Sequence, residues 1–107
     1  VTSYIYLNYK YLCKQMSTCK EVIVFPLEAT YLVWIDVSFY RRYVSEVEFL
    51  KIMDDCGIGI QTQSDFGMVE GLYVRLNIAC PRETLEKGIS RFIKGIEKIK
   101  DNFMVVI

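Results

Sequence analysis

The stretch Leu72-Tyr73-Val74-Arg75-Leu76-Asn77-Ile78-Ala79 is typical of a β-strand, because apolar side chains occupy every second position. Successive side chains of a strand point to opposite faces of a sheet. One face of this strand therefore carries Leu72, Val74, Leu76 and Ile78, and the other carries Tyr73, Arg75, Asn77 and Ala79. The apolar face predicts packing against helices, and Gly71 is expected to open the strand.

A long amphipathic helix is predicted directly after this strand. Pro81 suits the first helical position, where its missing N–H would have no partner in any case. Apolar residues then recur at intervals of four and three, at Leu85, Ile89, Phe92, Ile96 and Ile99. A strand and a helix that each have one apolar side indicate a sheet covered by helices.

The rest of the chain adds two helices and several short strands. Apolar spacing predicts helices over residues 4–16 and 46–56, the second with a capping box between Ser45 and Glu48 and a stop at Gly57. Short apolar runs predict strands at 22–25, 30–37 and 58–60, a polar connection at 61–65, and an edge strand in the tail 103–107. The run at 30–37 has almost no polar alternation, which predicts a strand covered on both faces.

Only one intervening helix is long enough to connect parallel strands, so a doubly wound parallel sheet is not expected. The order of elements favours an α+β fold, a small and mainly antiparallel sheet with helices packed on it. The length of 107 residues is that of one domain, and 52% of the residues are apolar. We therefore predict a single domain over residues 1–107.

The composition excludes several classes of protein. A formal net charge of zero without a basic block argues against a nucleic-acid binder or a protein of anionic membranes. The absence of histidine removes Ser-His-Asp and Cys-His catalysis and the HExxH and Cys2His2 zinc sites. No stretch approaches the roughly 18 apolar residues of a membrane span.

The four cysteines, Cys13, Cys19, Cys56 and Cys80, are irregularly spaced and form no CxxC pair. A domain of this size can bury a core without disulfides. The opening segment carries Lys10 and Lys14 where a secretory leader would need an uninterrupted apolar run. We therefore expect reduced, mostly buried thiols and a cytoplasmic protein.

Arg75 is the strongest candidate for chemistry. It lies in the middle of a strand with Tyr73 and Asn77 on its own face, and a guanidinium in such a position can bind a carboxylate or phosphate with two hydrogen bonds. The pattern alone leaves open an arginine on a solvated sheet face. The weaker candidates, each with a simpler structural interpretation, are the glycine segments 57–61 and 67–71, Asp54-Asp55, Arg41-Arg42, Trp34 and Cys80 at the start of a helix.

Five motifs occur in one order and together resemble a known family. They are Tyr4-Ile5-x-x-Asn8-x-x-Tyr11-Leu12, Glu28-Ala29-Thr30-Tyr31-Leu32-Val33-Trp34-Ile35-Asp36, Gly57-Ile58-Gly59-Ile60, Phe66-Gly67 and Val74-Arg75-Leu76-Asn77-Ile78-Ala79-Cys80-Pro81-Arg82. The pattern resembles the C-terminal small domain of class I/II pyridoxal-phosphate enzymes of the aspartate-aminotransferase fold. It is most similar to the cystathionine β-lyase-like (MalY/PatB) branch, whose members transaminate or cleave C–S bonds.

The resemblance implies a role for Arg75. In the family the arginine of this strand binds the α-carboxylate of an amino-acid substrate, and the RxN pattern gives Asn77 a supporting hydrogen bond. The cofactor, pyridoxal phosphate, is held by a lysine of the preceding large domain, and none of the eight lysines here stands in such a context. The resemblance therefore implies an inactive fragment without bound cofactor, taken from an enzyme that is a homodimer.

Two departures from the family pattern concern substrate preference. Ala29 stands where the family usually has glycine, and Thr62-Gln63 stand where it usually has Pro-Gly in a loop. The alternative to a fragment is a free-standing α+β module that binds or senses a small acid without catalysis, with Arg75 as its anchor. A third possibility is an interaction domain that associates through the exposed face of its sheet.

Overall fold

The computed structural model describes residues 3–27, 31–55, 57, 61–66 and 69–103. Its helices are α1 (Ser3–Met16), the 3-10 helix η1 (Ser38–Arg42), α2 (Glu46–Asp55) and α3 (Arg82–Phe103). Its strands are β1 (Ile23–Val24), β2 (Leu32–Asp36), β3 (Gln61–Phe66) and β4 (Val69–Asn77). This arrangement confirms the α+β fold expected from the sequence.

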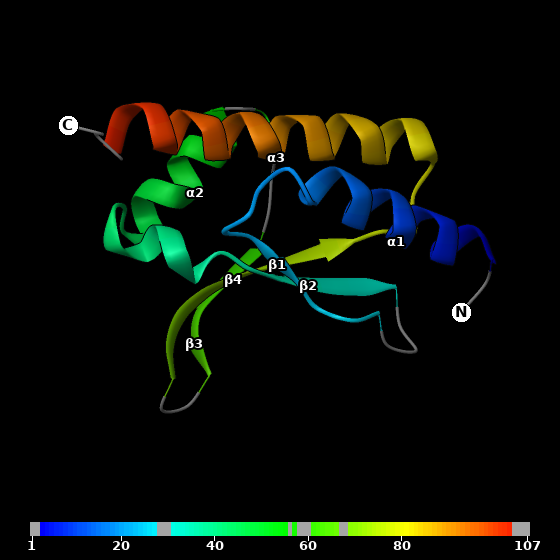
Figure 1. Cartoon of the computed structure of the whole chain (residues 1–107), viewed down its shortest axis with the longest axis horizontal. Coiled ribbons are helices and arrows are strands. Elements are labelled where there is room, and N and C mark those ends of the chain that lie inside the picture. The colour runs from blue at the N-terminus through cyan, green and yellow to red at the C-terminus, as the bar shows by residue number, and fades with distance from the viewer. Residues whose placement is uncertain (1–2, 28–30, 56, 58–60, 67–68, 104–107) are drawn as a thin grey trace.

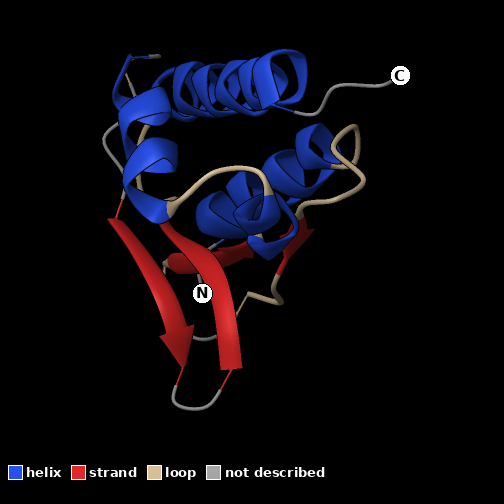
Figure 2. Ribbon diagram, turned by 90° about the vertical axis from the view of Figure 1, so that its left-hand side faces the viewer, coloured by secondary structure: helices blue, strands red, loops and turns tan. Residues whose placement is uncertain are grey.

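The four strands form one antiparallel sheet in the order β1-β2-β4-β3. Helices α1, α2 and α3 all lie on one side of this sheet, with α3 running along the top of the molecule (Figure 1). In the perpendicular view, the β3–β4 hairpin extends away from the helices (Figure 2). The sheet therefore has one face covered by helices and one face that the described residues leave open.

The core lies between the helices and the covered face. Val33, Ile35, Leu72 and Val74 of the sheet are each at most 1% exposed. Helix α3 contributes the predicted apolar side, with Leu85, Ile89, Phe92, Ile96 and Ile99 all buried. Full burial of one such side chain contributes about 1.5–3 kcal/mol, so this contact fixes the helix on the sheet.

The helix boundaries follow the predicted signals. Ser45 and Glu48 form the capping box, with the Glu48 N–H donating to Ser45 Oγ at 3.1 Å and the Ser45 N–H donating to Glu48 Oε1 at 3.2 Å. Gly57 follows α2 with a φ of 83°, a left-handed conformation that favours glycine. Pro81 stands directly before α3, where its carbonyl accepts the N–H of Leu85.

Three expectations about β3 and β4 were wrong. The polar stretch predicted as a connection at 61–65 is strand β3, because pairing with β4 satisfies backbone groups whatever the side chains are. Thr62 and Gln63 consequently lie in a strand and not in a loop. Gly71 does not open β4 but lies inside it, since the strand begins at Val69 and ends at Asn77.

Among the described residues, strand β2 is fully covered on one face only. Its residues alternate between half-buried and buried, with Val33 and Ile35 in the core and Leu32, Trp34 and Asp36 half-exposed. The expected strand at 58–60 and the end of the apolar tail, 104–107, lie outside the described residues, and Phe103 belongs to α3. No helix in the described part of the chain is long and apolar enough to cross a membrane.

Candidate functional site

The open face of the sheet carries the predicted site residue Arg75. Strand register places Arg75 opposite Trp34, Asn77 opposite Leu32 and Tyr73 opposite Asp36. Residues that pair across antiparallel strands project to the same side, so these six form one surface, here named the open face. The intervening residues, Val33, Ile35 and Val74, are at most 1% exposed and belong to the core.

Arg75 is half-buried on this face, and Asn77 is exposed. The Asn77 side chain is oriented by the turn that follows it, because Asn77 Oδ1 accepts the N–H of Ala79 at 2.8 Å. A guanidinium that is half shielded from water by its neighbours binds an anion more strongly than a fully solvated one. The sequence therefore correctly placed Arg75 and Asn77 together on one side of β4.

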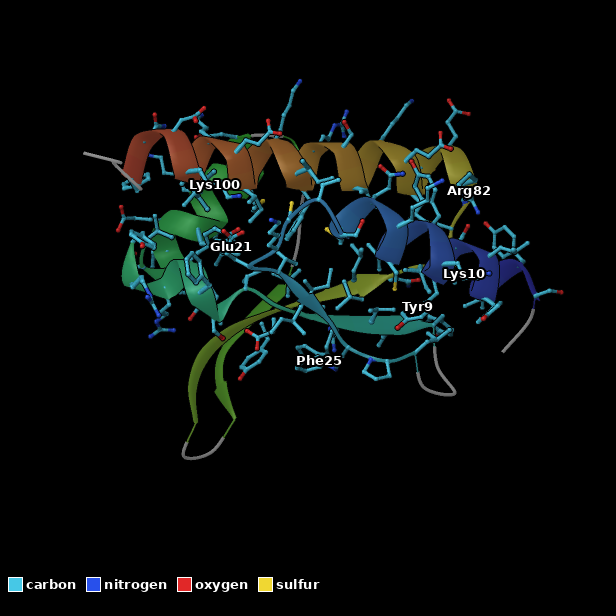
Figure 3. The ribbon with its side chains drawn as sticks, viewed as in Figure 1. Tyr9, Lys10, Glu21, Phe25, Arg82 and Lys100 are labelled. Atoms are coloured by element: carbon cyan, nitrogen blue, oxygen red, sulfur yellow. The ribbon has the colours of Figure 1, made fainter. Side chains whose placement is uncertain are left out.

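Tyr73, the third residue predicted for this surface, is not accessible. It is only 8% exposed, and its ring packs against Phe25 with 6.2 Å between centroids. Phe25 follows β1, where its N–H donates to the Trp34 carbonyl, and the Tyr9 hydroxyl donates to its carbonyl at 3.1 Å. Figure 3 shows Tyr9 below α1 and Phe25 lower in the same view, beside the sheet.

The part of β4 around Gly71 and Leu72 is held by η1. Ser38 Oγ accepts the Leu72 N–H at 2.9 Å, and the Ser38 N–H donates to Asp36 Oδ1 at 2.8 Å. Arg41 Nη1 donates to the Gly71 carbonyl at 3.1 Å. Arg41, one of the weaker sequence candidates for anion binding, thus has a structural partner, and Arg42 lies over the Phe39 ring at 5.0 Å.

The end of β4 is held by a residue that the sequence analysis did not single out for chemistry. Asn8 of α1 is 1% exposed and donates to the carbonyls of Ile78 and Cys80. Its position was detectable, because Asn8, Leu12 and Met16 follow one another at steps of four and form the buried row of α1. A helix face drawn through apolar residues alone runs from Ile5 and Tyr9, both half-buried, and misses Asn8.

Cys80 does not have the properties of a nucleophile. Burial raises the pKa of its thiol, which opposes the thiolate that a nearby helix start would favour. Cys13, Cys19 and Cys80 are free thiols, and Cys56 lies outside the described residues. The described residues contain no group of three or more His, Cys, Asp or Glu side chains placed to hold a metal ion.

A lysine attaches pyridoxal phosphate in the family that the sequence resembles, so the position of the lysines matters. All eight belong to the helices or to the turn after α1, and none lies on a strand. They are Lys10, Lys14, Lys20, Lys51, Lys87, Lys94, Lys98 and Lys100. Helices α1, α2 and α3 lie on one side of the sheet (Figure 1), so the structure brings none of these lysines onto the strand that carries Arg75.

Neither a protein-family model nor a curated protein matches the chain. Solved structures do match. A pyridoxal-phosphate-bound protein of Clostridium difficile 630, assigned to the aminotransferases, has a TM-score of 0.78 and 28% identity over 88% of this chain. A C–S lyase from Staphylococcus hominis, complexed with the inhibitor L-cycloserine, has a TM-score of 0.74 and 26% identity over 94% of this chain.

A third structure, from Corynebacterium diphtheriae and assigned as a pyridoxal-phosphate-dependent β-cystathionase, has a TM-score of 0.67 and 28% identity over 89% of this chain. The matches cover 24%, 26% and 25% of those three proteins, so the chain spans about a quarter of their length. In fold and in sequence, the chain is thus similar to a segment that makes up about a quarter of each of these pyridoxal-phosphate-dependent proteins.

Proposed function

We propose that the chain is the C-terminal small domain of a pyridoxal-phosphate-dependent aminotransferase or C–S lyase, and that Arg75 binds the α-carboxylate of its amino-acid substrate. The observation that carries the proposal is the half-buried position of Arg75 on the face that the helices leave uncovered, in register with Trp34. The similarity to aminotransferases and a C–S lyase supports the choice of reaction class.

The arrangement suits carboxylate binding for physical reasons. The planar guanidinium offers two parallel N–H donors that match the two carboxylate oxygens. Trp34, directly opposite on β2, limits the water around that ion pair. Asn77 lies two residues along the same face, where its Nδ2 group can donate to the same carboxylate while Oδ1 accepts from Ala79.

The cofactor belongs to the remaining three quarters of the protein in this proposal. Pyridoxal phosphate, when bound there, supplies an electron sink for the substrate's Cα carbanion. This chain holds the substrate carboxylate and turns its open face toward the cofactor-binding part. That contact would cover the half-exposed Leu32 and Trp34, which the chain alone leaves accessible, and the intact enzyme would act as a homodimer.

The test uses Arg75→Ala in the complete protein that carries this chain. Loss of this charge-paired hydrogen bond should cost about 2–4 kcal/mol of transition-state stabilisation. The specificity constant for the amino acid should therefore fall by roughly 30- to 1,000-fold. Arg75→Lys keeps the charge but not the paired donors, so it should recover only part of this loss. Arg42→Ala removes an exposed arginine beside Phe39 and serves as the matched control. An unchanged specificity constant in Arg75→Ala rejects the role.

A second measurement separates the fragment from a free-standing module. The isolated chain, mixed with pyridoxal phosphate and reduced with borohydride, is expected to give no stoichiometric adduct and no turnover. Thermal unfolding of the chain in the presence of amino and keto acids is expected to show no saturable shift, because only one side of the site is present. A clear saturable shift that Arg75→Ala abolishes would favour the small-acid module instead.

A further inference from the structure

Asn8 is the one buried polar side chain among the residues whose exposure the structure describes. Its side chain makes three hydrogen bonds, all to residues 70 or more positions away. Asn8 Nδ2 donates to the carbonyl of Ile78 at 2.9 Å and to that of Cys80 at 3.0 Å. Asn8 Oδ1 accepts from Arg82 Nε at 3.1 Å. A buried amide bonded on both sides is costly to replace, because each lost bond leaves a buried group unpaired.

Arg82 completes this contact at the start of α3. Its Nη2 donates to the Leu7 carbonyl at 3.2 Å, and its guanidinium lies 4.6 Å from the centre of the Tyr11 ring. The Tyr4 hydroxyl also donates to the Cys80 carbonyl. We name Tyr4, Asn8, Tyr11 and Arg82 the clamp. Figure 3 shows Arg82 at the first turn of α3, next to α1.

The clamp joins two of the sequence motifs into one structure. Tyr4, Asn8 and Tyr11 are the polar members of the first motif, and Arg82 ends the motif that contains Arg75 and Asn77. The motif at residues 74–82 thus has two parts. Arg75 and Asn77 lie on the open face, whereas Arg82 is exposed and donates hydrogen bonds to α1.

The clamp acts on the segment that orients Asn77. The turn from Asn77 to Cys80 is closed by the Ala79 N–H donating to Asn77 Oδ1, and the Ile78 N–H donates to the Tyr31 carbonyl at 2.9 Å. Asn8 holds the two carbonyls of the same turn, those of Ile78 and Cys80. Helix α1 therefore helps to fix two features. One is the direction of the Asn77 side chain, and the other is the position of the end of β4, the strand that carries Arg75.

We propose that Asn8 is a positioning residue for substrate binding, which acts through the carbonyls of Ile78 and Cys80 on Asn77 and Arg75. The inference rests on the proposed function, since it needs Arg75 to bind a carboxylate. Asn8 itself touches no substrate. Small displacements of a binding group weaken binding strongly, so loss of the clamp should affect substrate affinity more than the rate of the bound complex.

The test compares Asn8→Asp with Asn102→Asp in the complete protein. Asn8→Asp keeps an acceptor for Arg82 but removes both donors to Ile78 and Cys80, and Asn102→Asp makes the same chemical change at an exposed site of α3. Asn8→Asp should raise KM for the amino acid about three- to tenfold with kcat changed by less than about twofold. Asn102→Asp should change neither constant.

The double variant distinguishes positioning from a general loss of stability. In the Arg75→Ala background, Asn8→Asp should raise KM no further, because the group that it positions is absent. Arg82→Ala should raise KM about as much as Asn8→Asp. The two substitutions together should raise KM little more than either one alone. If Asn8→Asp leaves KM unchanged while Arg75→Ala raises it, the inference is wrong and the proposed function stands. If Arg75→Ala also has no effect, the proposed function and the inference both fail.

If Asn8→Asp does not fold, Tyr11→Leu provides the second variant, since it removes the ring under Arg82 without placing a charge in the core. Tyr11 is half-buried, and its replacement by another large apolar residue keeps most of the packing. A KM increase that disappears in the Arg75→Ala background supports the proposal, and an equal effect in both backgrounds overturns it.

Discussion

The two faces of β4 differ in what they contribute to the protein. On the covered face, Leu72, Val74 and Ile78 are each 0% exposed and pack against the helices. On the open face, Arg75 is half-buried and Asn77 is exposed. A period of two residues lets one strand carry part of the core on one side and a binding group on the other. Substitutions on the two faces should therefore separate stability from binding.

The largest effect on stability is expected for Leu72→Ala. Truncating a fully buried leucine removes its transfer free energy and leaves a cavity, which costs about 2–5 kcal/mol. Arg75→Ala, three residues along the strand, should lower the free energy of unfolding by less than about 1 kcal/mol, because it empties no core position. Urea unfolding of the chain measures both variants. A larger loss of stability in Arg75→Ala than in Leu72→Ala would contradict the separation of the two faces.

Around Gly71, Ser38 of η1 and Tyr73 cover the open face. Substitutions at two glycines test this contact. A Cβ on Gly71 would lie 2.7 Å from Ser38 Oγ and 2.8 Å from Tyr73 Oη, whereas a Cβ on Gly88 of α3 would meet nothing within 4 Å. Gly71→Ala should therefore destabilise the chain by about 1–3 kcal/mol through overpacking. Gly88→Ala should stabilise it by about 0.5–1 kcal/mol, because glycine is unfavourable inside a helix.

Thermal and urea unfolding give the sign of each change directly. Equal signs for Gly71→Ala and Gly88→Ala would show that η1 and Tyr73 do not close the sheet at Gly71. The expected loss in Gly71→Ala should shrink in a Ser38→Gly background, since the closest of the contacting atoms, Ser38 Oγ, is then absent.

Local signals in the sequence were sufficient for the three α-helices and for the two faces of β4, but not for η1. Pro81, the Ser45–Glu48 capping box and Gly57 each act within one helical turn, so their effects can be inferred without knowledge of the fold. The same holds for Arg75, because alternation along a strand needs no partner to be known.

Features that depend on distant parts of the chain were not predictable in this way. The polar segment 61–66 forms β3 because β4 lies beside it, although its side chains give no strand pattern. Tyr73 is buried by Phe25, a residue next to β1 that lies two strands away in the sheet. Asn8 is a polar residue in a helix, and its importance comes only from carbonyls 70 or more positions later.

The smallest expected effect comes from the ion pair at the edge of the covered side, where Lys100 Nζ lies 3.4 Å from Glu21 Oε2. Figure 3 shows Glu21 below Lys100, where the turn after α1 meets α3. A backbone hydrogen bond, followed by the Lys100 ammonium, lowers the pKa of Glu21 below its ordinary value of 4.5. The folded state therefore favours the ionised carboxylate. Its stabilisation is fully present above pH 4.5 and is lost as the pH falls through the folded-state pKa.

Glu21→Gln tests this, because it removes the titrating group and nearly preserves the shape of the side chain. The difference in free energy of unfolding between the unsubstituted chain and Glu21→Gln should be small at neutral pH, since the side chains of Lys100 and Glu21 are 37% and 28% exposed. It should decrease further as the pH is lowered below 4.5, and added salt should reduce it at neutral pH. A difference that grows on acidification would mean that the carboxylate is held in its protonated form, and the ion pair would then not contribute to joining α3 to the turn after α1.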